Sequence, residues 1–507
     1  MRARLFAAIF GAFLGLTLFR FGNPPILEEF LKEWSFAPEW ILAPVSSDNL
    51  FLGGTWPIAW AYRLLALTGF LGLLAARWTR PAPRWLIALP LAWLLWQFLA
   101  STVSVAPELS IATLKHFSAC VTCFYLGFFS LGQVPRLWPF WLGLLCGFLL
   151  VLAMGLDQHF GGLEESRKYV RHQLELYPHL EYQTPPELRS RMSSNRIYAT
   201  LFYPNALAGA LLLLLPAMLA AVWRICDLFR ASDRSLLSAA LAALGIAAAC
   251  LYLYVLSSTV GCLWILLFGL ALLLPLPKWL PVLLLALAGL ACLYWSGSKG
   301  GWLLMLVTGI LALLRLPLGK HFRIALISCI LLGGLAGFFW KYAGFFQKGA
   351  TSVSARFDYW RAAVQTAKHR PLFGTGPGTF AIPYQKIKRP ESEMARLAHN
   401  DYLEQASDSG VPGFLAYTLF IVAALMWSFP KRPGRSPPPR AEGGLGEREP
   451  ATNWQTFSIW LGVLGWALQG LLEFGLYIPA LAWPAFALLG WLLAQPRNPM
   501  DKPTHAG

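Results

Sequence analysis

The stretch LFYPNALAGALLLLLPAMLAAVW, residues 201–223, decides the fold. It contains no charged residue, and its apolar residues would occupy every side of a helix. A helix of about 20 such residues is long enough to cross the hydrocarbon core of a bilayer. The stretch is therefore typical of a membrane-spanning helix, not of the amphipathic helix of a soluble protein.

The composition of the whole chain agrees with this interpretation. Of its 507 residues 57% are hydrophobic and only 13% are charged, whereas soluble domains carry roughly 25% charged residues. The net charge of +16 would suggest nucleic acid in a soluble protein. In a membrane protein the basic residues are explained first by orientation, so we expect no nucleic-acid partner.

Similar apolar runs recur along the chain. They predict an all-α polytopic integral membrane protein with about 12–14 transmembrane helices and a large helical external loop. The candidate spans are 4–20, 54–76, 85–103, 112–132, 137–156, 201–223, 235–256, 259–276, 279–295, 300–314, 323–340, 411–428, 456–472 and 475–494.

Short loops rich in Lys and Arg indicate the orientation, because such loops stay in the cytoplasm. They are MRAR at the start, RWTRPAPR at 77–84, the segment 224–234, RLPLGKHFR at 315–323 and KRPGRSPPPR at 431–440. The opposite side then receives residues 21–53, 157–200, 296–301, 341–410 and 473–479.

Four parts follow from this arrangement. Residues 1–340 are expected to hold transmembrane helices with an external loop at about 157–200, and residues 341–410 a large external loop that carries the polar motifs. Residues 411–494 are expected to hold the C-terminal spans, with a flexible cytoplasmic loop at about 430–453. Residues 495–507 form a cytoplasmic tail. Long loops are usually functional or disordered, and aromatic residues favour the first alternative here.

An amphipathic helix is predicted at residues 354–371, where Phe357 and Trp360 begin an apolar face at helical spacing. One interpretation is a helix that lies on the membrane surface with its basic face toward lipid headgroups. The other is that Arg356 or Arg361 holds phosphate oxygens, which suit the geometry of a guanidinium group.

The next segment, PLFGTGPGTF at 371–380, has glycine at positions 374, 376 and 378. It lacks the G-K-[ST] of a nucleotide-binding P-loop, and it follows a helix where a dinucleotide-binding loop would follow a strand. We expect the glycines to form a tight turn that brings two helices close together.

The segment AHNDYLEQASDSGVPG at 398–413 combines a histidine with helix signals. Asp401 followed by Glu404 resembles a capping box, so a short helix should begin here and stop at Gly410, with His399 and Asn400 at its mouth. A helix N-terminus and nearby arginines favour a neutral imidazole, which can accept a proton as a general base. The alternative is a histidine that only hydrogen-bonds within the loop.

Three further polar residues lie where external loops meet spans: Arg196, Asn205 and Lys299. Ionisable groups at such depth are functional candidates, although a lysine there can also extend its amine to the membrane surface. External cations beside a candidate base suggest an anionic substrate anchored in the outer leaflet, such as a lipid diphosphate. Because no carboxylate cluster offers a metal cage, we expect neither metal nor cofactor, and the cations would stabilise the leaving diphosphate.

In combination these motifs make the chain similar to the O-antigen ligase and polymerase superfamily of polytopic membrane glycosyltransferases. The resemblance covers about residues 190–490 and rests on seven motifs in order. They are RIYATLFYPNALA at 196–208, SGSKGG at 296–301, R-x-x-x-W at 356–360, P-L-x-G-x-G-x-G-x-F at 371–380, A-H-N-x-Y-L at 398–403, GVPG at 410–413 and LEFGLYIPA at 472–480.

The resemblance implies transfer of a glycan from undecaprenyl diphosphate to an acceptor hydroxyl, at the periplasmic face of the bacterial inner membrane. The acceptor would be lipid A-core, another glycan or a protein. By the same resemblance His399 is the base and Arg356 a diphosphate ligand. The other candidate substrate-binding residues are Arg196, Asn205, Lys299, Trp360, Arg361 and Asn400.

One departure and two alternatives remain. The superfamily usually has Ser-Arg where this chain has Ser298-Lys299, and lysine lacks the bidentate geometry of arginine. The LEFGLYIPA ending favours a ligase over a glycan polymerase of the same superfamily. A flippase or transporter for a lipid-linked sugar would instead need ionisable residues near mid-bilayer, and here they gather in external loops and at span ends.

Overall fold

The computed structural model describes residues 2–28, 56–77, 82–176, 194–230, 236–255, 258–316, 318–347, 351–390, 392–430 and 453–496. Within these ranges all regular secondary structure is helical, which confirms the all-α prediction. The expected loop at 430–453 and the tail at 495–507 lie almost entirely outside the described residues, as does much of the external loop at 157–200.

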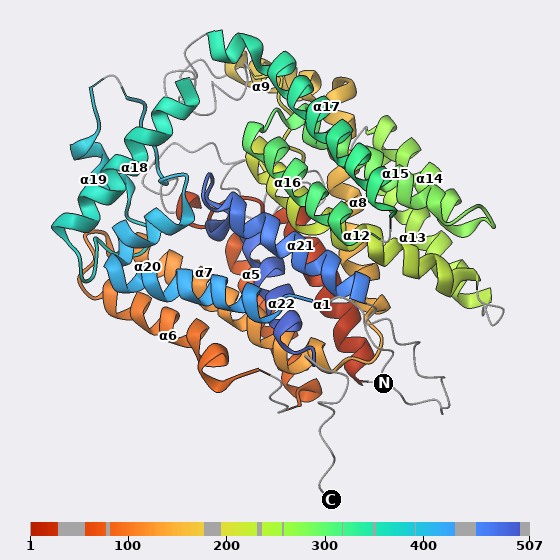
Figure 1. Ribbon diagram of the computed structural model, residues 1–507, viewed down its shortest axis with the longest axis horizontal. Helices are drawn as coiled ribbons and strands as arrows, with labels where there is room; N and C mark the ends of the chain where they lie inside the picture. Colours follow the sequence, from red (N-terminus) through yellow and green to blue (C-terminus); the bar gives the residue numbers. More distant parts are fainter. Residues whose placement is uncertain are drawn as a thin grey trace, which may run out of the picture.

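The helices follow one another as shown in Figure 1. They are α1 (Arg2–Arg20), α5 (Ile58–Ala75), α6 (Arg84–Ser101), α7 (Pro107–Tyr125), η1 (Leu126–Ser130), η2 (Leu131–Gln133), α8 (Trp138–Asp157), η3 (Gln158–Gly162), α9 (Leu163–Leu176), α12 (Pro204–Arg230), α13 (Leu236–Val255), α14 (Thr259–Leu273), α15 (Trp279–Ser296), α16 (Lys299–Arg315), α17 (Lys320–Gln347), α18 (Thr351–His369), α19 (Ala381–Ile387), α20 (Asp401–Trp427), α21 (Asn453–Gln469), η4 (Gly475–Tyr477) and α22 (Pro479–Leu493).

The chain is a multi-pass membrane protein. In the described part of the chain nine helices are long and apolar enough to cross a bilayer, and three shorter apolar helices accompany them. The sequence pattern predicted about 12–14 spans. Helix α22 is one of the shorter three, with 15 residues. It rises only about 22 Å, and such a length is tolerated because other helices, not lipid, surround it.

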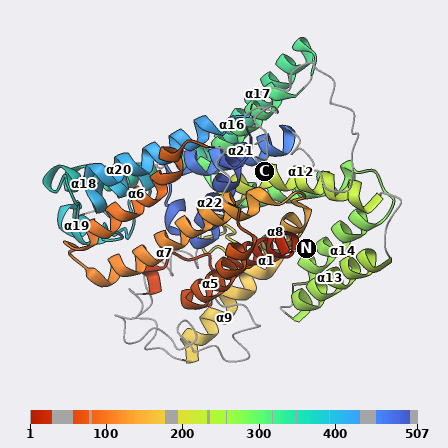
Figure 2. The same cartoon turned by 90° about the horizontal axis from the view of Figure 1, so that it is seen from below.

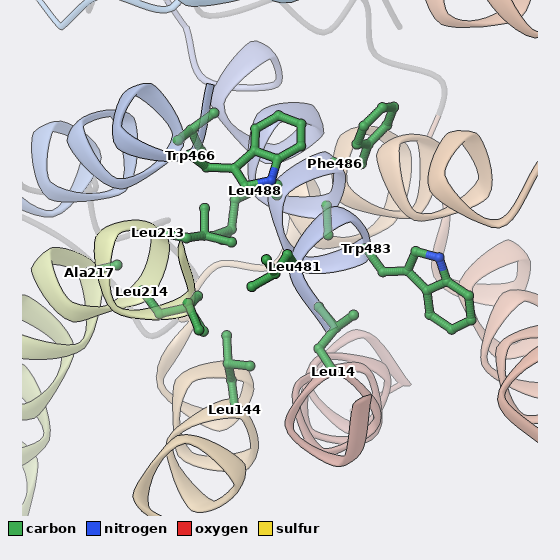
Figure 3. Close-up of a cluster of buried hydrophobic side chains, with 14 of the residues drawn as sticks. Leu14, Leu144, Leu213, Leu214, Ala217, Trp466, Leu481, Trp483, Phe486 and Leu488 are labelled. Atoms are coloured by element: carbon green, nitrogen blue, oxygen red, sulfur yellow. The ribbon is translucent and has the colours of Figure 1, made fainter. Parts of the chain in front are cut away.

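Helix α22 forms the centre of the bundle. Every one of its residues is buried, and it contacts α1, α7, α12, α20 and α21. Figure 3 shows Leu481, Trp483, Phe486 and Leu488 of α22 among Leu14, Leu144, Leu213 and Trp466 from the surrounding helices. The last helix of the chain therefore carries the core against which earlier helices pack.

Two ends of the bundle can be told apart from helix directions. The C-terminal end of α16 meets the ends of α20 and α21 where Arg315 lies 4.7 Å from the Phe429 ring centroid and 4.8 Å from that of Phe457. At the opposite end of the bundle, α16 begins at Lys299, α20 begins at Asp401 and α21 ends at Gln469. The polar motifs thus gather at the end opposite the basic loop at 315–323.

Helices α18 and α19 lie beyond that polar end, next to α20, as the two views agree (Figures 1 and 2). The buried face of α18 matches the predicted apolar face of Phe357, Trp360, Val364 and Ala367 only in part. Ala367 is buried and Trp360 half-buried, but Phe357 is 61% exposed and Val364 is 39% exposed, whereas Tyr359, Ala362 and Ala363 are buried. A mainly alanine face packs closely against α20 and α19, and the two larger apolar side chains point outward.

Candidate active site

A broken helix positions the histidine segment. Helix α20 is interrupted at Gly410, which has φ 70° and ψ −175°, so a short first section runs from residue 401 to the break as predicted. Its N-cap is Asn400, whose side chain accepts hydrogen bonds from the N–H groups of Tyr402 (3.1 Å) and Leu403 (3.0 Å). The predicted cap at Asp401 was therefore wrong by one residue.

The two carboxylates of the expected capping box serve other purposes. Asp401 accepts a hydrogen bond from the N–H of Leu476 at 3.0 Å, and Glu404 accepts one from the N–H of Ala398 at 2.9 Å. Both side chains are buried. They tie the start of α20 to the turn before α22 and to the residue before His399.

The glycine segment supplies hydrogen bonds to the break in α20. The N–H of Gly376 donates to the carbonyl of Asp408 at 2.8 Å, and the N–H of Gly378 donates to its carboxylate at 2.6 Å. Both glycines have positive φ, as does Gly374, where a Cβ would overlap the carbonyl of Ser407. The predicted close turn is confirmed, and it completes the backbone hydrogen bonds that a break leaves open.

Glu473 is the residue on which the predicted site residues converge. Its Oε2 lies 3.0 Å from Nδ1 of His399, and its Oε1 accepts a hydrogen bond from the Asn205 amide at 2.6 Å. The same Oε1 forms an ion pair with Nη2 of Arg356. Glu473 is 8% exposed and follows α21 directly. One buried carboxylate therefore joins residues from α12, α18 and the start of α20.

Arg196 extends this cluster through Asn205. Its Nη2 donates to Oδ1 of Asn205 at 2.8 Å, and its Nε donates to the carbonyl of Ser296 at 2.7 Å. Gly297 follows with φ +62°, and a Cβ there would come within 3.1 Å of Nε of Arg196. The SGSKGG motif therefore makes a tight turn that leaves space for the guanidinium group.

His399 is held in a defined position. Because an ionised carboxylate only accepts hydrogen bonds, Nδ1 must carry the proton toward Glu473, so the lone pair of the neutral imidazole lies on Nε2. The ring lies 4.8 Å from the Phe474 ring centroid and 5.7 Å from that of Tyr359. Its backbone φ is +52°, a conformation that costs a non-glycine residue energy and is often found at functional sites.

The charges at this cluster favour an anion. Burial raises the pKa of Glu473, but the hydrogen bond from His399 and the positive charges of Arg356 and Arg196 outweigh burial, and the pKa lies below its ordinary value. Glu473 is therefore ionised. Lys299 lies near both arginines, with its ammonium 5.1 Å from the Tyr342 ring centroid. Two arginines thus face the Glu473 carboxylate, and a lysine lies near both of them.

Not every predicted residue reaches the cluster. Trp360 contacts it, since its indole N–H donates to the carbonyl of His399 at 3.4 Å. Arg361 instead pairs with Asp358 of its own helix at 2.8 Å and lies away from Glu473. Asn400 also donates its amide to the carbonyl of Leu471 at 2.9 Å, so its side chain is occupied by the backbone.

Sequence reasoning missed Glu473 as a functional residue. The one available signal was an acidic residue between two apolar spans, within the LEFGLYIPA motif.

Among the residues that the structure describes, no group of three or more His, Cys, Asp or Glu side chains is arranged to hold a metal ion.

Comparison with known proteins gives two matches. Residues 282–418 match the model of the O-antigen ligase family, a region that includes Lys299, Arg356 and His399. Arg196, Asn205 and Glu473 lie outside it. An uncharacterized protein of Haemophilus influenzae is 30% identical over an alignment of 155 residues, and the match covers 26% of this chain and 39% of that protein. The chain therefore spans well under half of this relative's length.

Proposed function

We propose that this polytopic membrane protein of the O-antigen ligase superfamily transfers a glycan from undecaprenyl diphosphate to an acceptor hydroxyl. The observation that carries the proposal is the Glu473 carboxylate, which binds His399 and Arg356 together. A base and a diphosphate ligand are thereby held beside each other. The family match and the cationic surroundings support a glycan donor with an anionic leaving group.

In the proposed reaction His399 acts through Nε2. This nitrogen takes the proton of the acceptor hydroxyl while the acceptor oxygen forms a bond to the anomeric carbon of the glycan. The bond between that carbon and the phosphate oxygen breaks, and undecaprenyl diphosphate leaves with the electron pair. Glu473 holds the proton on Nδ1, so the lone pair remains on the reacting nitrogen.

Arg356 and Arg196 are proposed to stabilise the negative charge that develops on the leaving diphosphate, with Lys299 as a weaker, non-bidentate contributor. The cluster lies at the end of the bundle opposite the basic loop at 315–323. By the distribution of Lys and Arg this end faces the periplasm of a bacterial inner membrane. The acceptor would be lipid A-core, another glycan or a protein.

The test is a complementation experiment in a host that lacks the native gene. His399→Ala and Arg356→Ala are expected to lower glycan product by about 100-fold or more while the lipid-linked donor accumulates at the outer face of the membrane. His369→Ala is the matched control, because this histidine is exposed and forms a hydrogen bond with the carbonyl of Gln365 in its own helix. Normal product from both site variants would refute the proposal.

The same experiment separates the alternatives. A flippase would leave the donor on the cytoplasmic side when it fails, whereas a transferase leaves it outside. Single glycan units that still reach the acceptor when activity is lost would indicate a polymerase, because a ligase would attach none.

A further inference from the structure

Both oxygens of Glu473 are already in use within the protein. Oε2 binds the base, and Oε1 binds Arg356 and Asn205. Arg356, however, is used only in part: its Nε is buried and has no hydrogen-bond partner. A buried donor without a partner is costly, so this guanidinium group has unused capacity for a ligand that offers several oxygens.

A lipid diphosphate would compete with Glu473 for the same guanidinium group. It offers more negative charge than one carboxylate and can engage two guanidinium nitrogens at once. Asn205 would keep its own hydrogen bond to the carboxylate, since its amide carries no charge. The ion pair of Arg356 is therefore the contact that a donor would weaken first.

We propose that Glu473 is a positioning residue that couples donor binding to the strength of the base: the donor diphosphate draws Arg356 away and leaves the carboxylate to His399. This inference rests on the proposed function and deepens it. When the diphosphate binds Arg356, this guanidinium group no longer compensates the negative charge of Glu473. The carboxylate then interacts more strongly with the imidazole of His399. His399 then becomes a stronger base only when there is a glycan to transfer.

The titratable and charged groups around Glu473 fit this role. They are His399 before α20, Arg356 of α18, Arg196 of the segment before α12, and Asp401 at the start of α20. The cations keep the pKa of Glu473 below its ordinary value in spite of burial. The carboxylate can therefore remain ionised while one cation moves from it to the donor.

Glu473→Gln tests the coupling in the purified full-length protein, with undecaprenyl diphosphate as the binding probe and a lipid-linked glycan for turnover. Glutamine can still accept the hydrogen bond from His399 but no longer holds Arg356 by charge. The probe should bind about tenfold more tightly, because it no longer has to break the charge-assisted hydrogen bond between Arg356 and the carboxylate of residue 473. Turnover should fall by about 100-fold or more. Glu393→Gln, at an exposed carboxylate, should change neither.

Opposite effects on binding and turnover separate this role from a merely structural one, which would weaken both. A second readout is the pH–rate profile of the unaltered protein. The acid limb of the profile should lie at higher pH when donor is saturating than when donor is scarce. The pH difference between these two acid limbs should be smaller in Glu473→Gln. Unchanged or weaker probe binding in that variant, with His399→Ala inactive, would overturn the coupling and leave the proposed function standing.

Discussion

Asn400 allows a direct choice between a structural and a substrate-binding role. The sequence predicted a candidate substrate-binding residue, whereas in the structure both polar atoms of the side chain form hydrogen bonds within the protein. The carbonyl oxygen caps α20 through the N–H groups of Tyr402 and Leu403, and the amide donates to the carbonyl of Leu471. Asn400→Ala removes both contacts, and Asn400→Ser keeps an oxygen that can cap.

The expected magnitudes follow from these contacts. Loss of an N-cap costs about 1 kcal/mol, and loss of the hydrogen bond to the Leu471 carbonyl costs about 1 kcal/mol more. Asn400→Ala should therefore lower the free energy of unfolding by about 2 kcal/mol, a factor of about 30 in the folding equilibrium. Asn400→Ser should lose about half of that free energy, because a serine hydroxyl also caps well.

The assay is reversible unfolding by added detergent in bicelles, followed by binding of undecaprenyl diphosphate to the fraction that remains folded. Stability should fall in the order unaltered protein, serine variant, alanine variant, with donor affinity of the folded fraction changed by less than about threefold. If both variants unfold like the unaltered protein and lose donor binding, Asn400 contacts substrate and our assignment of a cap is refuted.

Three other outcomes are expected. Gly374→Ala should destabilise the protein by about 2–4 kcal/mol, because its φ is positive and a Cβ would overlap backbone. Gly333→Ala, where a Cβ meets no atom within 4 Å, should be neutral or stabilising by up to about 1 kcal/mol in the same detergent unfolding assay. In turnover assays Arg356→Ala should lose about 100-fold and Arg361→Ala less than about tenfold, and equal losses would contradict the placement of Arg361. Because the pKa of Glu473 lies below its ordinary 4.5, its ionised form stabilises the fold above that value. The difference in free energy of unfolding between the unaltered protein and Glu473→Gln should therefore be constant near neutral pH and become smaller as pH falls below 4.5. A difference in free energy that stays constant down to low pH would argue against the ion pair.

The membrane helices could be predicted because their signal is local. A continuous apolar run needs no knowledge of its neighbours, and residues 204–223 of the stretch at 201–223 indeed lie within α12. Loop glycines were also predictable, since alternation at 374, 376 and 378 has few explanations other than positive φ. These features depend on residues that are close in sequence.

The cluster could not be derived in the same way. The hydrogen bonds of Glu473 connect it to residues 74, 117 and 268 positions away, so no spacing rule reaches across them. The buried face of α18 was predicted only in part for a related reason: its neighbours α19 and α20 determine which side is covered. The one-residue error at the cap of α20 arose because Asn and Asp are both good N-caps and stand side by side.

The central place of α22 has a consequence for how the protein is made. Helix α22 fills the middle of the bundle, so the helices synthesised before it must leave a groove open until it arrives. Glu473 lies between α21 and α22 and is therefore inserted together with them. A nascent chain carries Arg196, Arg356 and His399 before the carboxylate that joins them has been synthesised, so the cluster can form only after α21 and α22 have been inserted.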